Sequence, residues 1–186
     1  MDIPPRLTDE YRRLADIKEE RLARDLALLA ARIGLAWIFI YNGGEKLFGI
    51  FGGGGIHQSS VFFGTVAHLH PAVFFTVVAG ITEFFGGIAV GVGLFGRIAS
   101  VGLVGDMVIA MVTVTWGNGI VSNASGGGYQ LNVVLATLAL VVAFLGTGRL
   151  SLDFVLRTFW EKSVASKTKT TGSVRYEDRA DQVPAS

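Results

Sequence analysis

The chain has 186 residues, of which 51% are hydrophobic and 17% are charged, and its mean hydropathy is +0.51. A soluble domain carries charges on about a quarter of its residues, so this composition predicts a membrane protein of one domain. The chain contains no cysteine, which excludes structural disulfides, thiolate metal sites and dithiol redox chemistry.

Residues 1–25 predict an amphipathic helix on the cytoplasmic surface. Thr8 is a candidate N-cap, and apolar residues follow at helical spacing among Arg, Lys and Glu side chains: Tyr11, Leu14, Ile17 and Leu22. Such a helix can lie on lipid headgroups, pack on the chain itself or dock a soluble partner.

Four apolar segments predict four membrane spans within residues 26–150. The first covers about 26–48, and the second and third lie in 71–116 with a tight turn at Gly96 and Arg97. At about 1.5 Å per residue, these helices are long enough to cross a hydrocarbon layer of roughly 30 Å. The fourth segment, at about 131–145, is shorter.

Residues 151–186 predict a short interfacial helix followed by a disordered cytoplasmic tail. Ser151 can cap the helix, and the tail from residue 163 is rich in Ser, Thr, Lys and Asp.

The distribution of Lys and Arg predicts the orientation. With four spans, both termini and Arg97 share one side, which carries almost all the basic residues, whereas the opposite loops contain only Lys46. The positive-inside rule then predicts a multi-pass protein of a bacterial-type inner membrane with both termini in the cytoplasm. Aromatic residues fall near the opposite interface: Tyr41, Trp116 and Tyr129.

Two acidic residues, Glu83 and Asp106, fall near the middle of the second and third predicted spans. A charge at this depth costs at least about 2.5 kcal/mol, so it is normally paired, neutralised or turned towards protein or water. Depth counted along the chain predicts an ion pair between Arg32 and Asp106 and a weaker pair between Lys46 and Glu83.

Two interpretations of the buried polar residues stay open. In the first, these residues only lock the helices together. In the second, they line a cavity that meets a quinone headgroup or another small polar ligand. The candidate ligand-binding or intramembrane polar residues are Arg32, Asn42, Glu45, Lys46, Glu83, Asp106 and Gln130. The sequence singles out no catalytic residue and predicts no metal site.

The run RIGLAWIFIYNGGEKLFG at 32–49 resembles the first-helix pattern of DoxX-like membrane proteins. The run ITEFFGGIAVGVGLFGRIASVGLVGDMVIA at 81–110 and the run GTGRLSLD at 146–153 resemble later motifs of that family, in the same order and spacing. The resemblance implies a four-helix inner-membrane protein. By position, it singles out Arg32, Lys46, Glu83, Arg97 and Asp153.

The same resemblance implies a link to redox chemistry. Some relatives are subunits of a thiosulfate:quinone oxidoreductase, and others are linked to a membrane-associated oxidoreductase complex in oxidative-stress defence. The family is functionally heterogeneous, so the resemblance bears more strongly on the fold than on the reaction.

The sequence therefore predicts an all-α, four-helix transmembrane bundle that is an accessory subunit or anchor of a membrane redox complex. Its expected cofactor is a non-covalently bound quinone. The expected partners are the lipid bilayer and a soluble redox enzyme docked on residues 8–25, without nucleic acid; a homo-oligomer stays open. The alternative is a small transporter or channel with Glu83 and Asp106 on a proton or solute path.

Overall fold

The computed structural model describes residues 5–121 and 127–162, with side chains from residue 12 onward. The predicted disordered tail lies outside these residues. Five main helices are formed: α1 (Pro5–Phe48), α2 (Gly55–Thr65), α3 (Ala72–Val92), α4 (Gly96–Ala110) and α5 (Gln130–Leu145). The predicted all-α class is confirmed.

Shorter helical segments connect or extend these five. They are η1 (Ile50–Gly52), η2 (Met111–Thr115), η3 (Trp116–Asn118) and a helix at residues 152–162. The Ser151 hydroxyl accepts a hydrogen bond of 3.2 Å from the backbone N–H of Phe154, which confirms Ser151 as the cap of this last helix.

Within the described ranges, three helical stretches are long and apolar enough to cross a membrane: Arg12–Phe48, Ala72–Val92 and Gly96–Asn118. The chain is therefore a membrane protein. Helix α5 is also apolar, but its 16 residues rise only about 24 Å, less than a hydrocarbon layer of roughly 30 Å. The fourth span stays a prediction.

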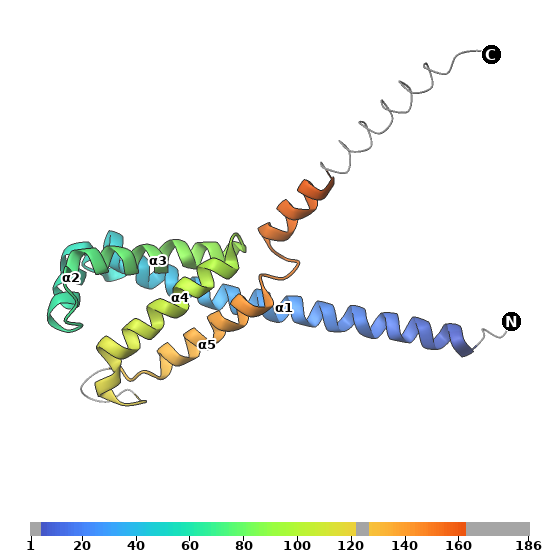
Figure 1. Ribbon diagram of the computed structural model, residues 1–186, viewed down its shortest axis with the longest axis horizontal. Helices are drawn as coiled ribbons and strands as arrows, with labels where there is room; N and C mark the ends of the chain where they lie inside the picture. The colour runs from blue at the N-terminus through green and yellow to red at the C-terminus, as the bar shows by residue number, and fades with distance from the viewer. Residues whose placement is uncertain (1–4, 122–126, 163–186) are drawn as a thin grey trace, which may run out of the picture.

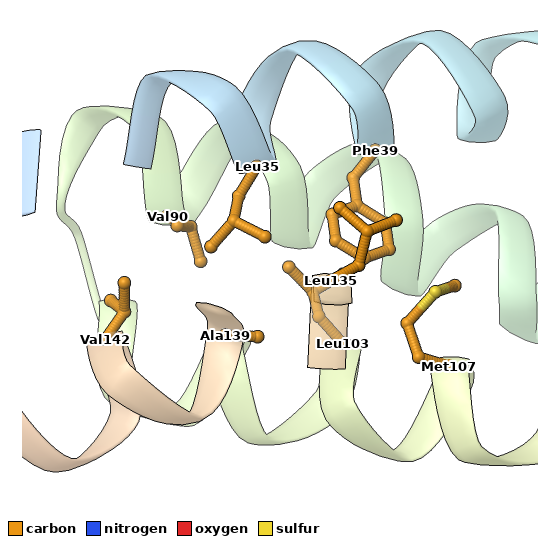
Figure 2. Packing of buried hydrophobic residues seen from close by; sticks show 8 residues of the cluster. All are labelled: Leu35, Phe39, Val90, Leu103, Met107, Leu135, Ala139 and Val142. Carbon is orange, nitrogen blue, oxygen red and sulfur yellow. The ribbon is translucent and has the colours of Figure 1, made fainter. Parts of the chain in front are cut away.

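The helices pack as two antiparallel pairs. Helix α3 lies along α1, α5 lies along α4, and α3 also contacts α4 (Figure 1). All four helices contribute to one apolar core, in which side chains of α1 and α3 meet those of α4 and α5 (Figure 2). Its buried members are Leu35, Phe39, Val90, Leu103, Met107, Leu135, Ala139 and Val142.

The predicted N-terminal helix and first span form one continuous helix, α1, of 44 residues. At about 1.5 Å per residue it rises roughly 66 Å, about twice the hydrocarbon thickness. Residues 12–24 are exposed, whereas Asp25 and Leu28 are buried. The helix therefore continues through the predicted boundary at residue 25, and its first part projects beyond the bundle (Figure 1).

Small residues bring α1 and α3 into close contact. A Cβ atom on Gly87 would lie 3.1 Å from the backbone nitrogen of Ile40, and one on Gly91 would lie 2.9 Å from the Cβ of Ala36. Glycine at these positions therefore permits the close approach of the two helices. This contact also carries Glu83 of α3 to the end of α1, where Lys46 lies.

Candidate ligand cavity

A cavity of about 380 Å³ lies among α2, α3, α4, η2 and the end of α1. Its walls are mostly apolar and include Phe62, Phe63, Phe75, Val78 and Ile109. The polar side chains in its lining are few: Lys46, Thr82, Glu83, Asp106, Thr113 and Thr115. A hollow of this size and character is typical of a small-molecule site.

An ion pair forms part of the cavity lining. The Nζ atom of Lys46, in the last turn of α1, lies 2.5 Å from Oε2 of Glu83 in α3. The Glu83 side chain is almost fully buried, while that of Lys46 keeps 24% of its surface exposed. The predicted pair between Lys46 and Glu83 is thus confirmed, and its short distance makes it a direct charged hydrogen bond.

Asp106 joins this pair from α4. Its carboxyl group interacts electrostatically with both Glu83 and Lys46. Its Oδ2 atom is buried, and its carboxyl group forms a hydrogen bond with that of Glu83. The cavity therefore brings together one ammonium and two carboxyl groups from three helices; we call these residues the charged triad: Lys46, Glu83 and Asp106.

Arg32 takes no part in the charged triad. The residue is 1% exposed, and its guanidinium group donates hydrogen bonds of 2.6 to 2.8 Å to four backbone carbonyls: those of Val90, Gly91, Thr147 and Leu150. Within the described residues no ion pair connects it to Asp106, and Asp153 is the carboxylate whose charge acts on it.

The predicted ion pair between Arg32 and Asp106 is therefore wrong. The carbonyls at the C-terminal end of α3 have no further helical N–H groups to bind, and Arg32 supplies donors to two of them. Comparing the membrane depths of charged residues cannot reveal these partners of Arg32, because every residue of a helix carries a backbone carbonyl.

The family comparison covers the charged triad. A protein-family model described as DoxX matches residues 27–116, which include Arg32 and all three triad residues. Over these residues the chain belongs to the DoxX family. No match was found among the curated proteins or among the solved structures. DoxX proteins are membrane proteins often linked to redox or quinone-associated complexes.

Asp153 lies after the DoxX match and has a structural contact. Its carboxylate accepts hydrogen bonds from the backbone N–H groups of Phe95, at 3.0 Å, and Gly96, at 3.4 Å. These groups are at the N-terminus of α4, where free N–H donors favour a negative charge. Asp153 and Arg32 thus stabilise the same end of the bundle, away from the cavity.

The remaining candidate residues do not line the cavity of this DoxX protein. The Asn42 amide donates to the carbonyl of Ile38 within α1, at 2.9 Å. Gln130 begins α5, and its backbone N–H donates to the carbonyl of Ile120. Glu45 lines a second hollow of about 230 Å³ together with Lys46, Gln58 and Ser59. Lys46, Phe62 and Phe63 line both hollows.

Helix η2, at the end of the DoxX match, was not predicted from the sequence. It is a π-helix of five residues, and Thr113, Val114 and Thr115 from it line the cavity. Single π-helical turns are rare and occur frequently at functional sites. The run MVTVT contains β-branched residues but no breaker, so hydrophobic periodicity gives no signal for this widening.

The described residues contain no cluster of three or more His, Cys, Asp or Glu side chains that could hold a metal ion. The arrangement instead offers an apolar wall for a ring or chain and a small charged region for a polar group.

Proposed function

We propose that this chain is the membrane subunit of a redox complex and that its cavity takes the headgroup of a quinone-type carrier, bound non-covalently. In this proposal the bundle has four spans, with both termini in the cytoplasm of a bacterial-type cell. The observation that carries the proposal is the charged triad placed inside an apolar, membrane-embedded cavity.

The chemistry of the cavity suits such a ligand. A volume of about 380 Å³ accommodates an aromatic headgroup, and Phe62, Phe63 and Phe75 offer apolar and aromatic contacts to it. Lys46 donates one hydrogen bond to Glu83 and has further N–H groups that can bind a ring carbonyl. Charged side chains inside a membrane are costly, and they are usually retained for function.

The exposed part of α1 is the proposed docking surface for a soluble redox enzyme. Residues 12–24 project beyond the bundle, and Leu14 and Leu22 are 58% and 57% exposed there. Apolar side chains among Arg, Lys and Glu residues match helix-in-groove binding, in which an amphipathic helix buries one face against a partner.

Purification from the native membrane tests both parts of the proposal. The tagged chain, extracted in mild detergent, should carry a quinone and a redox enzyme identified by its activity. Glu83→Gln should lose the quinone and keep the enzyme, because it removes the charge that holds Lys46. Leu14→Ser combined with Ile17→Ser should lose the enzyme and keep the quinone.

Matched controls lie on the opposite face of the same helix. Arg12→Ser combined with Glu19→Ser should change neither result, since these side chains are exposed and lie across from Leu14 and Ile17. Recovery of a stable, homogeneous chain without quinone or enzyme would count against the redox proposal.

One observation favours a second candidate function, a transporter or channel. Lys46, Phe62 and Phe63 line both the cavity and the second hollow, so the triad carboxyls connect through Lys46 to another polar surface. A proton or solute path would use this connection. Under this alternative, the purified chain alone produces flux in vesicles, and Glu83→Gln abolishes the flux.

A further inference from the structure

The cavity reaches the surface of the bundle on the side of α3 and α4. Among the residues that line it, Val78 and Ile109 keep 44% and 51% of their surface exposed, and Gly102 and Gly105 are exposed as well. By contrast, Glu83 lines the same cavity and is only 4% exposed. The cavity therefore runs from an exposed apolar opening to a buried carboxyl group. We call this opening the lateral mouth: Val78, Gly102, Gly105 and Ile109.

The lateral mouth lies at a depth where hydrocarbon surrounds the bundle. Its residues belong to two candidate spans, Ala72–Val92 and Gly96–Asn118. At about 1.5 Å per residue, Val78 lies roughly 9 Å from the start of the first of these spans, and Ile109 lies roughly 13 Å from the end of the second. Both positions are well inside a hydrocarbon layer of roughly 30 Å. A molecule at the lateral mouth is therefore next to lipid tails.

Two glycines leave space at the lateral mouth. A Cβ atom on Gly105 would meet nothing within 4 Å, and one on Gly102 would lie 3.5 Å from Cγ2 of Thr82, which is an ordinary contact. Helix packing thus does not require glycine at either position, whereas it does at Gly87 and Gly91. Glycine is a poorer helix former than alanine, so its presence on α4 is not explained by the stability of the helix. The space that both glycines leave belongs to the cavity.

The second hollow gives a water-soluble ligand a less direct route to the cavity. Its lining is polar and includes Glu45, Gln58 and Ser59. The residues that line both hollows lie between them: Lys46, Phe62 and Phe63. The two phenyl rings are arranged edge to face with their centroids 6.2 Å apart. A strongly hydrated compound would have to pass these rings or cross the hydrocarbon, and both routes remove water from its polar groups at a cost.

We infer that the ligand is an amphiphile whose headgroup lies near Lys46 and Glu83 and whose hydrocarbon tail leaves through the lateral mouth into the bilayer. This inference rests on the proposed function, because it takes the cavity as the site of the carrier. It adds the class of carrier, a lipid-soluble molecule with a tail, and its route, which leads sideways from the lipid between α3 and α4.

A photoreactive carrier tests where the tail lies. The full chain in lipid nanodiscs is irradiated with a benzoquinone or a naphthoquinone that carries an alkyl tail with a diazirine in its middle, and peptide mass spectrometry locates the adducts. An excess of the same compound without the diazirine distinguishes bound probe from probe dissolved in the lipid. The adducts that this excess displaces should lie within residues 74–82 and 101–113.

Gly105→Leu should abolish the displaceable adducts, because its side chain would occupy the lateral mouth. Gly34→Leu is the matched control. A Cβ atom on Gly34 also meets nothing within 4 Å, but this residue lies on α1 and does not line the cavity. Its substitution should leave the adducts unchanged. Should Gly105→Leu not yield a monodisperse protein, the adducts of the wild type by themselves still decide the route.

The other outcomes separate the inference from the proposed function. Displaceable adducts confined to residues 52–59, beside the second hollow, overturn the lateral route and leave the proposed function in place. Absence of displaceable adducts with either headgroup overturns both. A dimer in native mass spectrometry that Gly105→Leu dissociates would mean that a second copy of the chain covers the lateral mouth, which also overturns the inference.

Discussion

At the scale of single residues, Arg32 holds three parts of the backbone together. From α1, its guanidinium reaches the last turn of α3 and the segment that follows α5. Its planar group directs N–H donors along several fixed directions, which suits four separate carbonyls. Arg32 therefore fixes how the ends of these helices meet, while the charged triad lies elsewhere.

We predict that Arg32→Lys destabilises the bundle. A lysine ammonium is a compact group with three donors and cannot reach all four carbonyls, and each buried acceptor left unsatisfied costs roughly 1 to 3 kcal/mol. The variant should lose about 3 kcal/mol or more of stability in detergent, followed by thermal unfolding with circular dichroism. Arg13→Lys, at an exposed position on the same helix, should unfold like the wild type. Equal unfolding of both variants would contradict the role given to Arg32.

These residues also show what the sequence could predict about the site. The pair of Lys46 and Glu83 was predicted only as the weaker of two pairs, because counting along the chain places Glu83 deeper in the membrane than Lys46. A buried carboxylate nonetheless needs a partner, and Lys46 is the cation at that end of the first span. The contact between Glu83 and Asp106 was not predicted, since two carboxyl groups are not expected to meet. The partners of Arg32 could not be predicted either, because they are backbone carbonyls.

At the scale of elements, the contact between α1 and α3 depends on glycine. A Cβ atom on Gly43 would overlap the backbone of Phe84 on α3, whereas a Cβ atom on Gly34 would meet nothing within 4 Å. Both glycines lie on α1, so they form a matched pair for substitution.

We predict opposite effects of alanine at these two positions. Gly43→Ala should force α1 and α3 apart, lower the unfolding temperature and weaken ligand binding, because Lys46 and Glu83 lie on the separated helices. Gly34→Ala should stabilise the helix by up to about 1 kcal/mol, since alanine is the better helix former. Scanning calorimetry of both variants in the same detergent measures the difference. An unchanged unfolding temperature in Gly43→Ala would show that the helices are less tightly packed than described.

Hydrophobic runs were sufficient to predict α3 and α4, because long apolar stretches bounded by a tight turn specify helices of membrane length. They did not predict that α1 would continue through residue 25. A change from amphipathic to apolar composition alters the surroundings of a helix without ending it, and no Gly or Pro interrupts the chain there. The helical propensity of the charged segment therefore keeps α1 continuous through residue 25.

At the scale of the whole molecule, most of the described basic residues lie at one end of the bundle. The start of α1 and the helix at 152–162 leave the bundle from the same end (Figure 1), and these segments carry most of the described Lys and Arg residues. Two aromatic stacks lie at the other end: Tyr41 of α1 on Phe51 of η1, with ring centroids 5.0 Å apart, and Trp116 of η3 on Tyr129 before α5, at 5.4 Å. By the positive-inside rule, the proposed topology places this basic end in the cytoplasm.

Single cysteines test this topology, because the chain has no cysteine of its own to react. In intact cells, a membrane-impermeant maleimide should label Val121→Cys, since residue 121 follows the third candidate span at the predicted outer face. Glu161→Cys should react only after permeabilisation, because α5 returns the chain to the cytoplasm if it crosses the membrane. Both positions are exposed, so absence of labelling reflects the membrane and not burial. Labelling of Glu161→Cys from outside would mean that the 16 residues of α5 do not cross, and the count of spans would fall to three.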